Sequence, residues 1–264
     1  MRLTSWNFLH GQSLNPAEKA DVARSLALLG SDVVALQEID YRLPRSQDVN
    51  QTLVVADAMN TSWWGFAPAL KGTPGVKWRK LDSREQQVLT ISDLDNQGEY
   101  YGISIVSKIP VKNWQRLELG KAWIGLPLLV ANEKGRVAPF YVKDEPRVAL
   151  AAVLENGWTV INVHLSFVPF VNIFQLLKVT RWAKKLERET STKVALVGDF
   201  NLPWGIPTRI TRWERATDAL TYPSWKPAIS FDYILLRDDA DLQSVEVVAP
   251  QMAMSDHRPI SIDI

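Results

Sequence analysis

The chain has 264 residues, 46% of them hydrophobic, which predicts a globular protein that buries a sizeable core. It has no cysteine, so disulfides and zinc–thiolate sites are excluded. The formal net charge is +1, which excludes the broad basic excess common in proteins that grip long nucleic acids, although a local basic face is compatible with it.

The sequence has none of the long apolar segments that target or anchor a protein. No apolar run approaches the roughly eighteen residues of a membrane helix, and the N-terminus lacks a leader-like stretch. We therefore expect no membrane span and a cytoplasmic location. No repeat, linker or low-complexity tract divides the chain, so we expect a single domain over residues 1–264. The sequence identifies no protein partner.

The N-terminal part of the chain predicts alternating strands and helices. Residues 3–7 predict a short strand, and residues 15–29 predict a helix with apolar positions at helical spacing. A buried strand over residues 33–38 and a second helix over residues 49–59 follow. Residues 67–87 contain several prolines and glycines and predict a long irregular loop.

Two pairs of strands are predicted in the middle of the chain. Strands over residues 100–106 and 111–119 flank a Lys-Ile-Pro turn and predict a hairpin. Residues 119–142 are apolar but interrupted by glycine and proline, so their pattern is ambiguous. Strands over residues 147–154 and 158–164 flank an Asn-Gly turn, which is a strong hairpin signal.

The C-terminal part begins with the longest predicted helix, residues 170–189. A buried strand over residues 194–199, a helix over residues 207–220 and closing strands from residues 231 and 260 follow. Strands outnumber helices and short turns join many of them, which favours mixed sheets over a regular βα alternation. About ten strands are enough for two sheets packed face to face with helices outside.

The helix predicted over residues 170–189 is rich in basic residues. The bland interpretation is a solvated helix face, and the alternative is a basic face on an otherwise balanced protein. The basic residues are Lys178, Arg181, Lys184, Lys185 and Arg188.

Polar side chains stand at the ends of six of the predicted strands. An Asp or Asn beyond a strand is commonly a turn residue, and a lone histidine is commonly just a hydrogen-bonded residue. Six such coincidences in one chain make that account unlikely, because ligands collect at strand ends in α/β folds and an unpaired charge there costs folding free energy. The residues are Asn7, Glu38, His164, Asp199, Asn201, Asp232, Asp256 and His257.

These residue types point to metal-assisted chemistry on a phosphate ester. Carboxylates and carboxamides are hard oxygen ligands that suit Mg²⁺, Mn²⁺ or Ca²⁺, and the two histidines can exchange protons near neutral pH. Asp232 or Asp256 could orient His257. Arg147 could hold a phosphate or a site carboxylate, or it could form a surface pair with Glu145. A cation, carboxylates and histidines together fit phosphate ester hydrolysis.

The motifs, taken in order, resemble the endonuclease/exonuclease/phosphatase superfamily over the whole chain. That group includes DNase I-like nucleases, exonuclease III-like enzymes, neutral sphingomyelinases and inositol polyphosphate 5-phosphatases. The resemblance implies an α/β (α+β) fold, a four-layer α/β/β/α sandwich with the site at one end. It rests on Trp6-Asn7, Leu36-Gln37-Glu38, Asn162-Val163-His164-Leu165, Gly198-Asp199-Phe200-Asn201, Phe231-Asp232-Tyr233 and Ser255-Asp256-His257-Arg258-Pro259.

The resemblance also implies a metal site and an arginine that supports it. Glu38 looks like the main metal ligand, supported by Asn7 and Asp256. Arg147 looks like the arginine that props the site in the DNase I branch. Ile103 stands where relatives commonly have an asparagine, which puts one substrate contact in doubt.

The remaining site residues carry the reaction in this resemblance. Asp199 and Asn201 look like the residues that position the attacking water or the scissile phosphate. His257, paired with Asp232, looks like the phosphate-side histidine, and its role as base or electrostatic stabiliser stays open. His164 looks like the second histidine, which apurinic endonucleases lack.

The expected function is that of a Mg²⁺-dependent phosphoesterase, with Mn²⁺ as a substitute. The simplest version is a phosphodiesterase that acts on nucleic acid or on a small or lipid-derived phosphodiester. The alternatives are a phosphomonoesterase of the same fold and a non-catalytic phosphate-binding protein.

Overall fold

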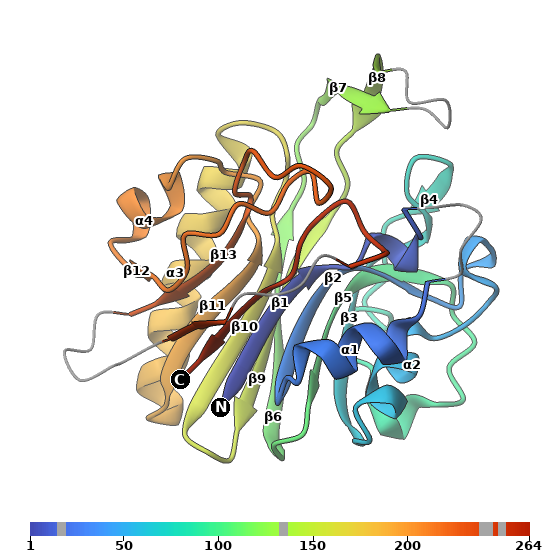
Figure 1. Cartoon of the computed structure of the whole chain (residues 1–264). Helices are drawn as coiled ribbons and strands as arrows, with labels where there is room; N and C mark the ends of the chain where they lie inside the picture. The colour runs from blue at the N-terminus through green and yellow to red at the C-terminus, as the bar shows by residue number, and fades with distance from the viewer. Residues whose placement is uncertain (15–19, 132–136, 238–244, 248–251) are drawn as a thin grey trace.

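Two β-sheets pack face to face in the computed structural model, and helices cover their outer faces (Figure 1). The fold is therefore an α+β two-sheet sandwich, as predicted. The structure describes residues 1–14, 20–131, 137–237, 245–247 and 252–264. No helix within these ranges is both long and apolar enough to cross a bilayer.

The first sheet has seven strands in the order β14-β15-β1-β2-β5-β3-β4. It is mixed, because β1 runs parallel to β2 and antiparallel to β15. Its strands are β1 (Arg2–Asn7), β2 (Val33–Tyr41), β3 (Trp63–Thr73), β4 (Lys77–Arg79), β5 (Tyr100–Ser107), β14 (Val245–Val247) and β15 (Ile260–Asp263).

The second sheet has six strands in the order β12-β13-β11-β10-β9-β6. Here β10 and β11 are parallel, and β9 pairs with β10 as the predicted hairpin. Its strands are β6 (Val111–Gly120), β9 (Arg147–Leu154), β10 (Trp158–His164), β11 (Lys193–Asp199), β12 (Glu214–Arg215) and β13 (Asp232–Leu236).

A separate two-stranded hairpin stands above the body in Figure 1. Its strands are β7 (Gly125–Ala131) and β8 (Val137–Lys143), which pair with each other over their full length. Neither strand joins either large sheet. Residues 132–136 between them lie outside the described residues.

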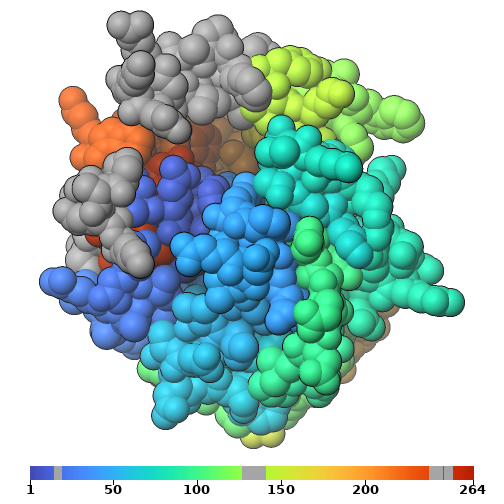
Figure 2. All heavy atoms as spheres, turned by 90° about the vertical axis from the view of Figure 1, so that its right-hand side faces the viewer, coloured from blue at the N-terminus to red at the C-terminus, as the bar shows by residue number. Residues whose placement is uncertain are grey.

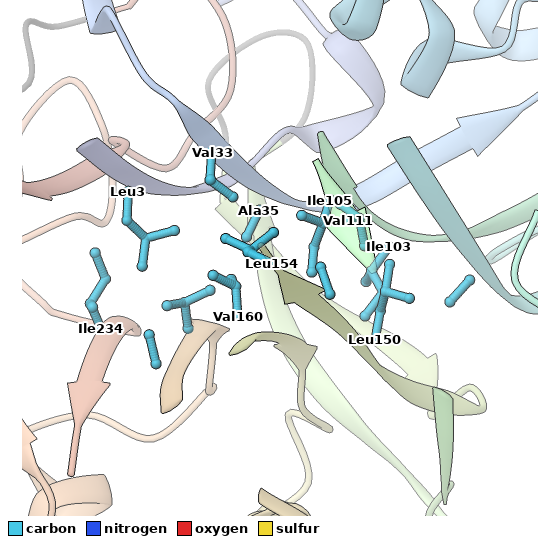
Figure 3. Packing of buried hydrophobic residues seen from close by; sticks show 14 of the residues in the cluster. Leu3, Val33, Ala35, Ile103, Ile105, Val111, Leu150, Leu154, Val160 and Ile234 are labelled. Atoms are coloured by element: carbon cyan, nitrogen blue, oxygen red, sulfur yellow. The ribbon is translucent and has the colours of Figure 1, made fainter. Parts of the chain in front are cut away.

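Aliphatic side chains from both sheets form the core between them (Figure 3). Leu3, Val33 and Ile105 from the first sheet meet Leu150 and Val160 from the second, and each of these side chains is fully buried. β-Branched and aliphatic residues dominate because strands covered on both faces admit few polar side chains. This continuous apolar layer fixes the two sheets relative to each other.

The helices lie outside the sandwich and bury one face each. Figure 2 looks onto the side formed by α1 (Val22–Leu29) and α2 (Gln51–Ala58), which pack on the first sheet. The helices α3 (Val171–Thr190) and α4 (Ile206–Thr211) pack on the second. Within the part of the chain that the structure describes there are also three short 3-10 turns: η1 (Leu9–Gly11), η2 (Pro44–Ser46) and η3 (Ile91–Asp93).

The predicted helices are present in the structure, and the last of them differs most from its predicted length. α1 ends at Gly30 as expected, and its first turn is capped by the side chain of Asp21, which accepts from the Arg24 amide. The expected start at residues 15–19 lies outside the described residues. α4 is much shorter than predicted, because Arg212 adopts a left-handed conformation that ends it.

Two predictions about the central strands were wrong. Residues 67–73 continue strand β3, because Pro68 lies at a shift of register where its missing N–H breaks no ladder. The strands β5 and β6 do not form a hairpin, since β5 belongs to the first sheet and β6 pairs with β9 in the second. The turn between them therefore carries the chain from one sheet to the other.

Candidate active site

Strand direction brings the polar strand ends to one edge of the sandwich. Asn7 is the last residue of β1, next to β2, and His164 and Asp199 are paired last residues of the parallel strands β10 and β11. Asp232 is the first residue of β13, which runs antiparallel to β11 and places it opposite Asp199. This edge is the upper one in Figure 1, away from both chain termini.

The buried carboxylate of Asp199 is the centre of the site. Its Oδ2 accepts a hydrogen bond from Asn7 Nδ2 at 3.1 Å and lies 3.6 Å from Nε2 of His164. The same oxygen lies 3.9 Å from Nε2 of His257. Its Oδ1 accepts the backbone N–H of Asn201 at 2.9 Å. Three side chains from distant parts of the sequence thus converge on one carboxylate.

Glu38 joins this cluster through Asn7. The Nδ2 of Asn7 donates to Oε1 of Glu38 at 3.0 Å, and that oxygen lies 4.0 Å from Nε2 of His164. Glu38 has a φ of +55°, where the register of β2 against β5 shifts between Leu36 and Ile39. A bulge of this kind redirects a side chain out of the regular alternation of a strand.

His257 is paired with the buried Asp232. Their Nδ1 and Oδ2 atoms lie 2.8 Å apart. Burial alone would lower the pKa of His257, but the charge and hydrogen bond of Asp232 outweigh it and raise this pKa to about 10. The imidazole is therefore protonated at neutral pH. Its Nε2 lies 3.9 Å from Oδ2 of Asp199.

His164 is in the opposite protonation state. Burial lowers its pKa well below the ordinary value, and the positive charges of Arg147 and His257 act in the same direction. It is therefore neutral at neutral pH. The site thus combines one charged and one neutral imidazole.

The acidic groups carry negative charge that the described side chains leave poorly compensated. Burial, followed by the charge of Asp256, raises the pKa of Glu38 to about 7. Burial also raises the pKa of Asp199 to about 6, although the charge of His257 opposes this. One buried oxygen each of Asp232 and Asp256 lacks a hydrogen-bond partner among the described residues.

This donor set fits a hard divalent cation. Carboxylate and amide oxygens suit Mg²⁺ or Mn²⁺, which would compensate the buried negative charge. Ligand atoms of Asp199, Asp232 and His257 also lie within 4.8 Å of one another. In that group, however, His257 and Asp232 already bind each other, so the carboxylate oxygens of Glu38 and Asp256 fit a cation better.

Arg147 is buried against two acidic residues. Its guanidinium lies 3.4 Å from Oε1 of Glu145 and 3.8 Å from Oδ1 of Asp144. The predicted alternative of a surface pair with Glu145 is therefore half right, since the pair exists but lies inside the protein. The Nε of Arg147 has no hydrogen-bond partner among the described residues.

Asn201 connects the site to α3. Its Nδ2 donates to the Leu165 carbonyl at 2.9 Å, and its own carbonyl accepts from Nδ2 of Asn172 at 3.0 Å. Its φ is +49°, a conformation that asparagine tolerates better than most residues. Asn201 therefore holds Asp199 through its backbone while its side chain ties the strand end to the neighbouring loop.

Sequence reasoning missed three parts of this neighbourhood. The ring of Tyr222 lies 5.0 Å from that of His257, and Asp144 lies in the charged group around Arg147. Beneath the site, Gln37 donates to Asn162 at 2.7 Å and joins the two sheets. An amide inside the apolar run 158–164 was a usable signal for Asn162, whereas nothing local marks Tyr222.

Sequence and structure comparisons both lead to one group of proteins. The sequence model described as the Endonuclease/Exonuclease/phosphatase family matches residues 4–257. Among curated proteins, none matches this sequence.

Solved structures share the fold at low sequence identity. An endonuclease/exonuclease/phosphatase from Beutenbergia cavernae DSM 12333 has a TM-score of 0.59 at 17% identity, covering 99% of this chain and 70% of that one. The Bacteroides thetaiotaomicron VPI-5482 mannosyl-6-phosphatase Bt3783 has 0.58 at 12%, covering 100% and 98%. The human Nocturnin catalytic domain, solved with a bound sulfate anion, has 0.57 at 14%, covering 99% and 92%.

Proposed function

The chain belongs to the endonuclease/exonuclease/phosphatase family, and we propose that it is a Mg²⁺-dependent phosphoesterase that cleaves a phosphodiester. One observation carries the proposal. The Oδ2 of Asp199 lies within 3.1 to 3.9 Å of side-chain nitrogens from Asn7, His164 and His257. A carboxylate held among such groups can position a water against a phosphorus atom while an imidazolium meets the developing charge.

A divalent cation completes the proposed site. Glu38 would hold it, with Asp256 as a supporting oxygen donor. Asn7 would add its oxygen only with its amide turned over, because its Nδ2 donates to Glu38 and Asp199 and its Oδ1 accepts from the Leu9 amide. When bound, the cation polarises a phosphoryl oxygen and neutralises charge that develops on the leaving side. Mn²⁺ should substitute for Mg²⁺, because both accept oxygen ligands.

The protein's own residues divide the remaining work. Asp199, fixed by the Asn201 amide, accepts a hydrogen bond from the attacking water and takes up its proton. His257 is charged at neutral pH, so its Nε2–H stabilises a non-bridging phosphoryl oxygen. His164 is neutral and serves as a hydrogen-bonding partner of the phosphate or of the leaving oxygen.

The balance of charge favours a phosphodiester over a phosphomonoester. The carboxylates of Glu38, Asp199 and Asp256 match the charges of one divalent cation and the His257 imidazolium, and Arg147 is already paired with Asp144 and Glu145, so no excess positive charge is left for the substrate. A singly charged diester therefore enters with less repulsion than a doubly charged monoester. The diester could be nucleic acid, a small molecule or lipid-derived.

A phosphomonoesterase is the second candidate. The observation in its favour is that one protein of the same fold is described as a mannosyl-6-phosphatase. Parallel assays with bis-p-nitrophenyl phosphate and p-nitrophenyl phosphate separate the two candidates, since the proposal requires faster hydrolysis of the diester.

The decisive experiment combines metal removal with one conservative substitution. Hydrolysis of bis-p-nitrophenyl phosphate should stop in EDTA and return with Mg²⁺ or Mn²⁺. Asp199→Asn should abolish turnover without lowering the thermal unfolding midpoint, because site charges cost stability. Asp218→Asn, at a side chain 93% exposed, serves as the matched control. Hydrolysis that survives EDTA would contradict the metal-dependent mechanism.

A further inference from the structure

Large apolar side chains are exposed on loops beside the candidate active site. We call this set the apolar rim. Their exposed fractions range from 55% for Trp225 to 100% for Trp123. Isolated exposed apolar residues are ordinary, but a cluster of this kind marks an interaction surface. The apolar rim consists of Trp123, Ile124, Phe170, Phe174, Trp204 and Trp225.

Hydrogen bonds hold two parts of the rim beside the site. Phe170 and Phe174 flank the first turn of α3, where Nδ2 of Asn172 donates to the Asn201 carbonyl at 3.0 Å. Trp204 follows Asn201 by three residues, so it belongs to the segment that this bond fixes. Phe170 adopts a φ of +67°, an unusual conformation for a bulky residue.

The other rim residues are tied to the same edge. In α3, Oε1 of Gln175 accepts from the Ser166 amide at 2.7 Å, and its Nε2 donates to the Gly120 carbonyl at 3.2 Å. Trp123 lies three residues beyond Gly120. Trp225 follows Ser224, whose amide donates to the carbonyl of Asp256 at 2.7 Å. The rim therefore belongs to loops that surround the strand ends.

The β7–β8 hairpin extends away from the body next to the rim (Figure 1). It follows directly after Trp123 and Ile124 and lies at the site end of the molecule (Figures 1 and 2). The two strand sequences, GLPLLVA and VAPFYVK, contain one charged residue, Lys143, whereas residues 132–136 that join them in the sequence contain three. A two-stranded hairpin alone is at best marginally stable in water, and an apolar one with no sheet to join gains most from an apolar partner.

The charges on the neighbouring segments have one sign. Residues 166–185, 200–213 and 219–230, which bear Phe170, Phe174, Trp204 and Trp225, contain no Asp or Glu. They contain seven basic residues, all with exposed side chains: Lys178, Arg181, Lys184, Lys185, Arg209, Arg212 and Lys226. A partner of this surface should therefore be both apolar and anionic.

We propose that the apolar rim docks on a phospholipid bilayer that contains anionic lipids. Trp and Phe side chains favour the interfacial region of a bilayer, and nearby basic residues are attracted to anionic headgroups. Single-stranded nucleic acid would also meet aromatic and basic side chains. Ile124, which is 61% exposed, offers no stacking face to a base, so the composition of the rim favours lipid.

Docking in this orientation places the strand ends against the headgroups. The substrate would then be the phosphodiester of a membrane lipid, a step that rests on the proposed function. The docking itself does not, because it can be measured without turnover.

The test uses vesicles of phosphatidylcholine with and without phosphatidylglycerol, in EDTA. The full-length protein should co-sediment with the anionic vesicles more than with the neutral ones. The double variant Trp123→Ser/Phe170→Ser should bind at least about ten-fold more weakly, as expected when two interfacial aromatic anchors are lost. Trp63→Ser is the matched control, since Trp63 is exposed at the start of β3, at the opposite end of the strands.

Three results would overturn the docking proposal. The first is absence of vesicle binding by the unaltered protein, and the second is an equal loss of vesicle binding in Trp63→Ser. The third is a double variant that still binds vesicles and loses only its binding to a single-stranded oligonucleotide. Hydrolysis of soluble bis-p-nitrophenyl phosphate should be unchanged in the double variant. If that hydrolysis is absent even in the unaltered protein while vesicle binding remains, the proposed function fails and the docking surface stands.

Discussion

The Nδ1 of His257 and the Oδ2 of Asp232 lie 2.8 Å apart and connect the two sheets across the site. Asp232 begins β13 in the second sheet, whereas His257 precedes β15 in the first. The contact is therefore tertiary, and it keeps the imidazole charged in a buried place. A buried cation beside a carboxylate is stable only while both partners are present.

Asp232→Asn should move the alkaline limit of activity. In the unaltered protein the pKa of His257 is raised to about 10, so its charge persists through neutral pH and is lost above that value. Without the Asp232 charge, the pKa falls toward or below its ordinary 6.5, and the activity that needs the imidazolium is lost at a lower pH. We expect a loss of about 10²- to 10⁴-fold in kcat at neutral pH.

The measurement is the pH dependence of kcat/KM with bis-p-nitrophenyl phosphate. Asp218→Asn, an exposed aspartate, should leave the whole profile unchanged. If the alkaline limb of Asp232→Asn coincides with that of the unaltered protein, Asp232 does not control the charge of His257.

Glu38→Gln should stabilise the cation-free protein and remove its response to Mg²⁺. Burial raises the pKa of Glu38 from 4.5 to about 7, so between these values the folded state keeps a proton that the unfolded state has lost. Stability therefore falls as pH rises through this window. The glutamine has no such charge, and we expect a gain on the order of 1–2 kcal/mol at about pH 8, discounted because the side chain is 23% exposed.

Urea unfolding at about pH 5 and about pH 8, with and without saturating Mg²⁺, checks this expectation. The unaltered protein should gain stability from Mg²⁺ at the higher pH, and the variant should not. Glu155→Gln, at an exposed turn between β9 and β10, is the control. An unchanged Mg²⁺ response in Glu38→Gln would place the cation elsewhere.

Arg147→Ala should destabilise the protein more at high pH than at low pH. It leaves Asp144 and Glu145 buried without their cation, and we expect a loss of about 3–5 kcal/mol. The pKa of Glu145 is already raised by burial, with Arg147 opposing the shift, so it rises further in the variant. A raised acid pKa contributes stability at low pH that is lost as the pH rises.

Denaturation at about pH 5 and about pH 8 measures this difference, and Arg147→Lys should restore part of the stability. KM separates the two roles assigned to this residue. A higher KM in the stable Arg147→Lys variant supports a substrate contact, whereas an unchanged KM assigns Arg147 to the scaffold alone.

Local sequence patterns predicted most elements because their causes are local. The apolar run of residues 158–164 and the Asn-Gly turn before it require no knowledge of the rest of the chain. Which strands pair with each other, in contrast, depends on distant parts of the chain. The run 111–119 reads as a strand whichever sheet it joins, and only the packed core decides that β6 pairs with β9.

The candidate site shows the same division. Carboxylates, amides and histidines at strand ends could be picked out, because a polar group there has no local explanation. The left-handed conformation of Glu38 and the buried acidic partners of Arg147 could not, since both depend on chain segments far away in sequence. The exposed aromatic residues of the rim could not be predicted, because nothing in the local sequence distinguishes them from aromatic residues of the core.

Asn162 offers the sharpest test of how the scaffold holds Glu38. Its Nδ2 donates to the carbonyls of Leu36 and Ser104 at 2.8 and 2.9 Å, at the point where β2 and β5 lose register. Its Oδ1 accepts from Gln37 at 2.7 Å. Asn162→Leu leaves these buried groups unpaired, and we expect a loss of about 2–4 kcal/mol in stability. Because the bulge that aims Glu38 loosens, Mg²⁺ affinity should fall as well.

Calorimetric titration with Mg²⁺ at a temperature where the variant remains folded separates the two effects. Thr159→Val, in the same strand, removes a buried hydrogen bond to Thr192 far from the bulge, so it should lower stability and leave Mg²⁺ affinity unchanged. Equal Mg²⁺ affinity in Asn162→Leu and the unaltered protein would mean that the bulge keeps its shape without the amide. A selective loss of Mg²⁺ affinity would make this buried asparagine a positioning residue of the metal site, acting through the strand that carries Glu38.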